Sequence, residues 1–244
     1  MLPRLPDLLA DLVVGSTCLG CARPGRLVCP DCRATLDLEA RPAWPTPAPA
    51  GLAPPWTAGE YAGLLRDLVV GHKERRLLAL RAPLGSLLAG AVAAAVGPAS
   101  GPLALVPVPS RPATVRARGY DATYAMTRRA VRDLRRAGHD AAVVPLLVTR
   151  GPVADQSGLG AADRFANLAG SLHCPTPGLR RLRAWRPAVR TVVCDDVLTT
   201  GATAREAQRA LEVVGLRVTG IATAAATRRL DTSRLRLSSE GMSD

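Results

Sequence analysis

Residues 190–206 read Arg-Thr-Val-Val-Cys-Asp-Asp-Val-Leu-Thr-Thr-Gly-Ala-Thr-Ala-Arg-Glu, and the rest of the chain is best understood from this stretch. Val192 and Val193 form a β-branched run that is typical of a buried parallel strand. Two adjacent carboxylates, Asp195 and Asp196, follow this run, and a helical pattern extends over 204–214. The stretch therefore predicts a strand, an acidic pair, a polar loop and a helix in direct succession.

The polar loop has the composition of a phosphate-binding turn. Gly201 lets the backbone turn tightly and approach a ligand closely. The first amides of the following helix have no intrahelical partner, so they can hold a phosphate with the help of the helix dipole. Threonine hydroxyls add further donors. The predicted phosphate loop consists of Thr199, Thr200, Gly201, Ala202 and Thr203.

A ribose 5-phosphate would satisfy both halves of this arrangement. Its vicinal 2- and 3-hydroxyls offer two donors to Asp195 and Asp196, while the 5-phosphate lies in the loop. The alternative is that the two aspartates open a turn and a threonine caps the helix. That alternative suits the dipeptide taken alone, whereas the complete ordered string favours a sugar phosphate.

The amino-terminal part of the sequence carries two close pairs of cysteines, and it predicts a small module over residues 1–40. A spacing of two residues lets both thiolates of a pair reach one tetrahedral metal, and two pairs complete a structural site. Thiolate ligands favour zinc or iron, and the short loops favour zinc. Two disulfides are the alternative, which a reducing compartment disfavours. The predicted zinc ligands are Cys18, Cys21, Cys29 and Cys32.

Bulk composition limits the classes of function. A net charge of +12 favours anionic partners such as phosphorylated metabolites or nucleic acid. Aromatic residues are only 3% of the chain, so stacking platforms for single-stranded nucleic acid are scarce. The first seventeen residues contain prolines and acids that a signal peptide would not carry. The apolar run 84–97 is too short to cross a bilayer and predicts a buried Ala-rich helix. We therefore expect a soluble, cytoplasmic protein without a membrane span.

The other segments can be assigned more coarsely. Residues 41–58 contain six prolines and predict a semi-extended linker and a domain boundary. The large domain is expected over 59–228, and the polar tail 229–244 is expected to be disordered. Within the domain, the patterns predict helices over 61–70, 122–137 and 204–214, strands over 103–111, 143–149 and 221–227, and a basic connector over 180–190.

Several arginines follow predicted strands or lie in loops, where they can meet a diphosphate. The rigid turn after the strand at 103–111 presents Ser110 and Arg111, or it is simply a loop with an exposed arginine. Arg118 lies shortly before the next helix and adds a further cation. A long polar segment, 150–167, reads as a lid that carries Arg150 and Arg164 or as a surface loop ending in a helix cap. The lid is either this segment or residues 111–119.

Taken together, these motifs resemble the ComF family, bacterial competence-associated proteins with a zinc ribbon ahead of a type I phosphoribosyltransferase domain. The resemblance spans about residues 18–227, and its most specific part is the string from Asp195-Asp196 to Thr203, which is similar to the phosphoribosyl-diphosphate signature of those transferases. Asp121 stands where the family tends to have Asn, which puts one side-chain contact in doubt. The chain also resembles the amidophosphoribosyltransferase domain, but we do not expect that activity, because Met1 and Leu2 open directly into the cysteine module without a glutaminase domain.

The resemblance implies an α/β fold with a central parallel sheet flanked by helices and a ligand, 5-phosphoribosyl 1-diphosphate, at the carboxyl ends of the strands. It also implies magnesium bridging diphosphate and ribose oxygens. Asp195, Asp196, Arg111 and Arg150 are the expected catalytic residues, and Ser110, Arg111, Arg118 and Arg164 are expected to bind the diphosphate. A link to natural transformation, single-stranded DNA and a helicase partner follows from the resemblance alone. The rival hypothesis is a non-catalytic ligand sensor or DNA-handling accessory protein whose basic ribbon contacts DNA.

Overall fold

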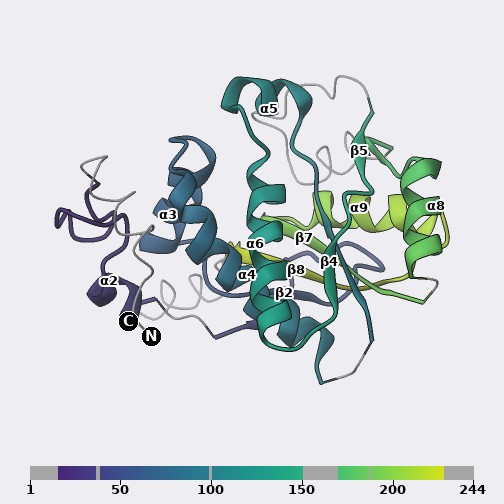
Figure 1. The fold of residues 1–244 in the computed structure, drawn as a ribbon, viewed down its shortest axis with the longest axis horizontal. Helices are drawn as coiled ribbons and strands as arrows, with labels where there is room; N and C mark the ends of the chain where they lie inside the picture. The colour runs from purple at the N-terminus through teal and green to yellow at the C-terminus, as the bar shows by residue number, and fades with distance from the viewer. Residues whose placement is uncertain (1–15, 37–38, 99–100, 151–169, 187, 228–244) are drawn as a thin grey trace, which may run out of the picture.

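The computed structural model describes residues 16–36, 39–98, 101–150, 170–186 and 188–227. Its centre is a six-stranded sheet in the order β1-β2-β8-β7-β3-β4, in which only the β1–β2 pair is antiparallel. Helices cover both faces of this sheet (Figure 1). The predicted α/β class with a mostly parallel central sheet is therefore confirmed, while the finer assignment to the phosphoribosyltransferase fold stays a prediction.

The elements follow one another along the chain in the order of their numbers. The strands are β1 (Arg41–Pro42), β2 (Pro55–Thr57), β3 (Leu103–Pro107), β4 (Ala141–Val143), β7 (Arg190–Leu198) and β8 (Val218–Ala226), and a separate two-stranded sheet pairs β5 (Val148–Thr149) with β6 (Leu172–His173). The helices are α2 (Pro30–Ala34), α3 (Gly63–Lys73), α4 (Arg81–Val96), α5 (Pro112–Arg118), α6 (Ala122–Arg136), α8 (Thr176–Trp185) and α9 (Ala202–Glu212), with a 3-10 turn at Leu78–Leu80.

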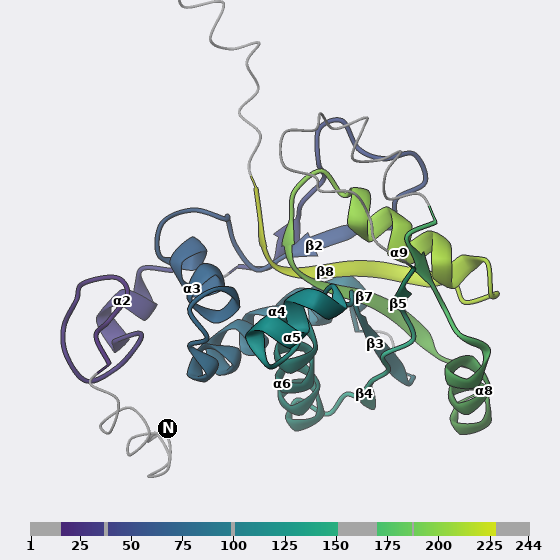
Figure 2. The ribbon, with the colours of Figure 1, turned by 90° about the horizontal axis from the view of Figure 1, so that it is seen from above.

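Two hydrophobic cores lie on opposite faces of the sheet. One contains Val192 and Cys194 of β7 together with apolar residues of α3, α4 and α6. The other contains Val193 and apolar residues of α8 and α9. Figure 2 shows α9 on one side of β7 and β8 and α4 and α6 on the other. Because β7 is covered on both faces, its residues from Thr191 to Cys194 are all buried, as the β-branched run predicts.

The Pro-rich segment 41–58 is built differently from the linker that its composition predicts. It supplies β1 and β2, and β2 pairs in parallel with β8 through the register Pro55↔Ile221. Ile221 N–H donates to the Pro54 carbonyl at 3.0 Å, so the prolines accept in this ladder where they cannot donate. Pro55 stands at the first position of its strand, where a proline is tolerated. The segment is therefore part of the sheet.

Two other predictions also differ from the structure. The expected strand over 143–149 is divided between β4 and β5, because Pro145 interrupts the ladder. The expected basic connector over 180–190 contains most of α8, in which Leu179 and Leu182 are buried. Proline near the start of α8 and the spacing of these leucines are helix signals that the arginine content obscured.

The helix expected at 84–97 is observed as α4. Together with the preceding 3-10 turn, it is long and apolar enough to resemble a membrane-spanning helix by composition. It packs instead against α6 and β8, and residues such as Leu84, Leu88 and Val92 are buried there. The helix therefore packs as part of the core on this face of the sheet.

Candidate functional site

The acidic pair lies in the second half of β7, close to the carboxyl edge of the sheet. Asp195 pairs in register with Thr223 of β8, and the ladder continues to Leu198. Successive side chains of a strand leave on alternate sides, so the two aspartates have different surroundings. Asp196 is buried at 6% exposure, whereas Asp195 is half-buried. The sequence treats them as an equivalent pair, and the structure makes them unequal.

Asp196 is held by Lys73, the last residue of α3. The Lys73 Nζ lies 2.5 Å from Asp196 Oδ2. Asp196 Oδ1 accepts from the backbone N–H of Val197 at 2.8 Å. Burial lowers the pKa of Lys73, but the carboxylates of Asp196 and Asp195 outweigh burial and raise it, so the ammonium stays charged. Sequence reasoning left Lys73 undecided, because nothing local to it points to β7.

Asp195 Oδ1 accepts a hydrogen bond from the Asp196 backbone N–H at 2.9 Å. Burial, and next the charge of Asp196, raise the pKa of Asp195 well above its ordinary value. Lys73 acts in the opposite direction but does not reverse the shift. Asp195 is thus the carboxyl of the pair that combines partial exposure with a perturbed pKa, which is a common property of functional sites.

The predicted phosphate loop forms a left-handed turn into α9. Gly201 has φ +75° and precedes the helix, whose first residue is Ala202. The N-cap Gly201 has no side chain to cap the helix, and the Ala202 N–H donates a long hydrogen bond to Thr200 Oγ1 at 3.4 Å. Thr199 is exposed, and Thr200 and Thr203 are partly exposed. The backbone therefore has the form of an anion-binding helix start.

The Pro-rich segment lies over this loop. A Cβ placed on Gly201 would lie 3.0 Å from Pro45 Cγ and 3.3 Å from the Pro49 ring. Side chains of α9 hold the same segment, since Arg205 Nε donates to the Ala50 carbonyl at 3.0 Å and Gln208 Nε2 to the Gly51 carbonyl at 2.9 Å. The glycine is thus needed both for its left-handed backbone and for the close approach of two prolines.

A cavity of about 460 Å³ opens beside the loop. It is formed where the carboxyl ends of β2, β7 and β8 meet the Pro-rich segment, a position typical of ligand sites in parallel sheets. Its lining includes Arg41, Trp44, Glu60, Leu198, Thr199 and Ala226. Trp44 is 52% exposed. Sequence reasoning missed this cavity because it took the Pro-rich segment to be a linker.

The residues predicted to bind the diphosphate follow β3. They differ in exposure and in whether another side chain already pairs with them. Ser110 is tied to Asp121, to which its N–H donates at 3.1 Å and its hydroxyl at 3.2 Å. Asp121 also caps α6 by accepting from the Tyr124 N–H. Arg118 pairs with Glu74 at 2.5 Å. Arg111 is exposed at the start of α5, so it is the most accessible of the three.

Of the two predicted lid arginines, Arg150 lies within the described residues. Arg150 is exposed just after β5, and its N–H donates to the Ser171 carbonyl at 2.7 Å. Arg164, with the rest of 151–169, lies outside the described residues. The other candidate lid, 111–119, is mostly the helix α5.

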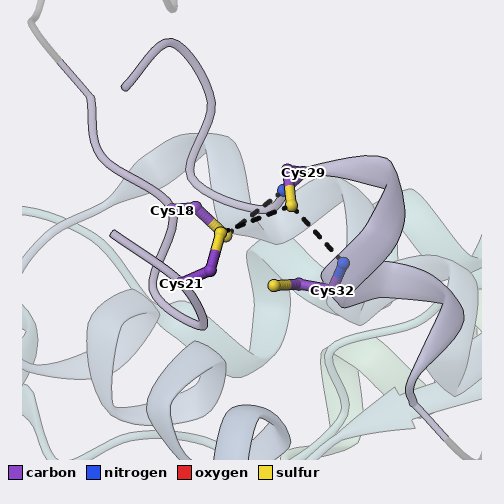
Figure 3. Close-up of side chains that lie close together, drawn as sticks. All are labelled: Cys18, Cys21, Cys29 and Cys32. Atoms are coloured by element: carbon purple, nitrogen blue, oxygen red, sulfur yellow. Dashed lines mark hydrogen bonds between the residues drawn. The ribbon is translucent and has the colours of Figure 1, made fainter. Parts of the chain in front are cut away.

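The four predicted metal ligands do come together. Their Sγ atoms all lie within 4.8 Å of one another, and those of Cys21 and Cys29 are 3.7 Å apart (Figure 3). A tetrahedral zinc with Zn–S bonds of about 2.3 Å requires sulfurs about 3.8 Å apart. Burial raises the pKa of the Cys18 thiol, but backbone N–H donors, led by that of Cys29, lower it to about 6. The cluster therefore suits a metal ion such as zinc, and its four thiolates would leave no open position for catalysis.

The cysteine module packs on α3 (Figures 1 and 2). A Cβ on Gly20 would lie 3.4 Å from Leu64, and one on Gly71 would lie 3.4 Å from Leu19. Helix α3 thus contacts the module along its length and ends at Lys73, beside the acidic pair.

No known family model matches this chain, and a comparison with curated proteins also gives no match. The fold and the cysteine cluster define its class, an α/β protein with a mostly parallel six-stranded sheet and an amino-terminal four-cysteine site.

Proposed function

We propose that this protein binds 5-phosphoribosyl 1-diphosphate at the carboxyl edge of its sheet, as the resemblance to the ComF family and its type I phosphoribosyltransferase domain suggests. The proposal depends mainly on the order of the structural features along β7 and α9. A half-buried carboxyl lies close before a left-handed glycine, which is the N-cap of α9 and has no side chain to cap the helix. These parts match a ribose with two hydroxyls at one end and a phosphate at the other.

In this proposal, Asp195 accepts a hydrogen bond from a ribose hydroxyl, and Asp196 lies beside Asp195 on β7. The amides at 201–203 and the threonine hydroxyls hold the 5-phosphate. In the transferase reaction, the bond between the anomeric carbon and the diphosphate oxygen breaks, and its electron pair leaves with pyrophosphate. Arg111 stabilises the departing charge. A nitrogen nucleophile forms the new bond and releases its proton. The cavity beside Thr199 offers space for that acceptor.

The resemblance implies a magnesium that bridges diphosphate and ribose oxygens of the ligand, and the acidic pair offers little to bind that ion as well. Both oxygens of Asp196 are engaged, and one oxygen of Asp195 accepts a backbone N–H. Magnesium requires near-ideal octahedral geometry. We therefore place no magnesium on the acidic pair and assign it no step. Zinc at the four cysteines would hold the amino-terminal module together and, through α3, support the site.

Titration calorimetry with 5-phosphoribosyl 1-diphosphate tests the proposal directly. Binding by the wild-type chain, lost in Asp195→Ala, is the expected result. Release of pyrophosphate with a panel of nitrogenous bases, abolished by the same substitution, identifies a transferase. Absence of any binding with and without magnesium would refute the proposal.

The second candidate function is a non-catalytic sensor or DNA-handling accessory protein in the cytoplasm of a transformable cell, working beside a helicase. Within residues 16–36, the arginines Arg23, Arg26 and Arg33 outnumber the single acid Asp31, which pairs with Arg23, and this local excess supports contact with nucleic acid. Salt-dependent binding of single-stranded DNA that survives Asp195→Ala favours this function. Ligand binding without turnover for any acceptor favours the sensor form.

A further inference from the structure

Lys73 is the only lysine in a chain with 32 lysine and arginine residues. It is also the basic residue that meets the acidic pair, with its Nζ 2.5 Å from Asp196 Oδ2. Its side chain is 32% exposed and that of Asp196 is 9% exposed. An ammonium is a compact point charge, whereas a guanidinium is a planar fork, so the two are not interchangeable at a confined site. The single lysine of the chain therefore lies at the centre of the candidate site.

The oxygens of the acidic pair are largely occupied by groups of the protein. Asp196 Oδ2 is buried, and within the described residues no donor other than the Lys73 ammonium reaches it. Asp196 Oδ1 and Asp195 Oδ1 each accept a backbone N–H, at 2.8 and 2.9 Å. This leaves one Asp195 oxygen for a ligand. A divalent cation would have to displace Lys73 to gain a second carboxylate.

The charges around the pair explain why a cation is needed there. Two adjacent carboxylates repel each other, and a phosphate monoester would add further negative charge. The groups that face Lys73 are Asp195 and Asp196 from β7, Arg118 from α5 and the neighbouring His72, which is buried and has a lowered pKa because of that burial. Since Arg118 is paired with Glu74, Lys73 is the cation that compensates the pair.

We propose that Lys73 is the built-in counter-cation of the acidic pair and that this half of the site therefore holds a ribose 5-phosphate group without a divalent metal. The inference rests on the proposed function, since it concerns the same pocket. On this view, the two parts of the ligand are bound in different ways. The ribose phosphate is held by the protein alone, and any magnesium accompanies the diphosphate.

Titration calorimetry with ribose 5-phosphate tests this, in EDTA and in magnesium. The wild-type affinities in the two buffers should agree within about threefold. Lys73→Met should lose at least about tenfold in EDTA, because the pair then carries an uncompensated charge, and should regain part of it in magnesium through the freed Asp196 oxygen. Arg75→Met removes an exposed charge two residues beyond the end of the same helix and should change the affinity less than about twofold.

The outcomes separate the two claims. Failure of the wild-type chain to bind ribose 5-phosphate or 5-phosphoribosyl 1-diphosphate in either buffer refutes the proposed function and this inference together. Wild-type binding that requires magnesium, with Lys73→Met unchanged, overturns this inference alone.

A spectroscopic readout does not depend on the stability of a variant. Reductive methylation with ¹³C-formaldehyde labels the Lys73 amine and the amino terminus only, since the chain has no other lysine. Ribose 5-phosphate added in EDTA should shift the Lys73 methyl resonances and leave those of the amino terminus in place. Saturating ligand without a shift at Lys73 would contradict the inference. In an Asp196→Asn background, where the ion pair is absent, Lys73→Met should no longer create a dependence on magnesium.

Discussion

The left-handed turn at Gly201 provides the sharpest test of how the Pro-rich segment lies on the predicted phosphate loop. Gly201 has φ +75°, and a Cβ at this position would lie 3.0 Å from Pro45 Cγ and 3.3 Å from Pro49. Gly201→Ala therefore carries two separate costs. One is the left-handed backbone of a residue with a Cβ, and the other is the collision with two rings that cannot rotate away.

The magnitudes of both costs can be approximated. The left-handed conformation costs an alanine about 1–2 kcal/mol, and overpacking of a well-filled contact costs about 1–3 kcal/mol. Gly201→Ala should thus lower the free energy of unfolding by about 2–5 kcal/mol in total. Gly138→Ala is the matched control, because Gly138 has φ +91° but nothing within 4 Å of its Cβ position. It should show only the first cost, about 1–2 kcal/mol.

Urea denaturation followed by circular dichroism measures the difference. The two variants should share the wild-type m-value and differ in their midpoints, with Gly201→Ala the lower. Calorimetry below the transition should also show weaker binding of ribose 5-phosphate to Gly201→Ala than to Gly138→Ala. Equal losses of stability in the two variants would show that Pro45 and Pro49 do not contact the loop. That result would refute the packing of the Pro-rich segment on Gly201.

Three further predictions concern the metal, the acid and the leaving group. Cys18→Ser should reduce the zinc content measured by atomic emission and lower the Tm, whereas Cys174→Ser, at an isolated cysteine, should leave the zinc content unchanged; equal zinc in both variants removes the metal assignment. Burial and then Asp196 raise the pKa of Asp195, so its stabilising contribution is complete below the unfolded-state pKa and is lost as pH rises through the folded-state pKa. Urea midpoints between about pH 4 and about pH 8 should therefore fall for the wild type relative to Asp195→Asn, and parallel curves would contradict the shift. Arg111→Ala should weaken binding of 5-phosphoribosyl 1-diphosphate about tenfold without changing the affinity for ribose 5-phosphate. Arg181→Ala, on the exposed part of α8, should change neither affinity. An equal loss for both ligands would show that Arg111 does not act at the diphosphate.

The sequence by itself determined the features that depend on neighbouring residues. The β-branched run of β7, the turn at Gly201 and the start of α9 follow in the predicted order, because burial of the apolar run and the left-handed glycine act over a few residues. The approach of the four cysteines was likewise predictable, since two short spacings bring the ligands of each pair close together. Helices α4 and α6 were expected within a few residues of their observed ends.

Only the tertiary structure decided how these parts are combined. It placed the Pro-rich segment in the sheet and over Gly201, and it brought Lys73 to Asp196 across more than half of the chain. It also made Asp195 and Asp196 unequal, which their adjacency in the sequence conceals. The physical reason is that these contacts join residues far apart in the sequence. Their partners are chosen by which apolar faces bury each other, and no local pattern around a proline or a single lysine records that choice.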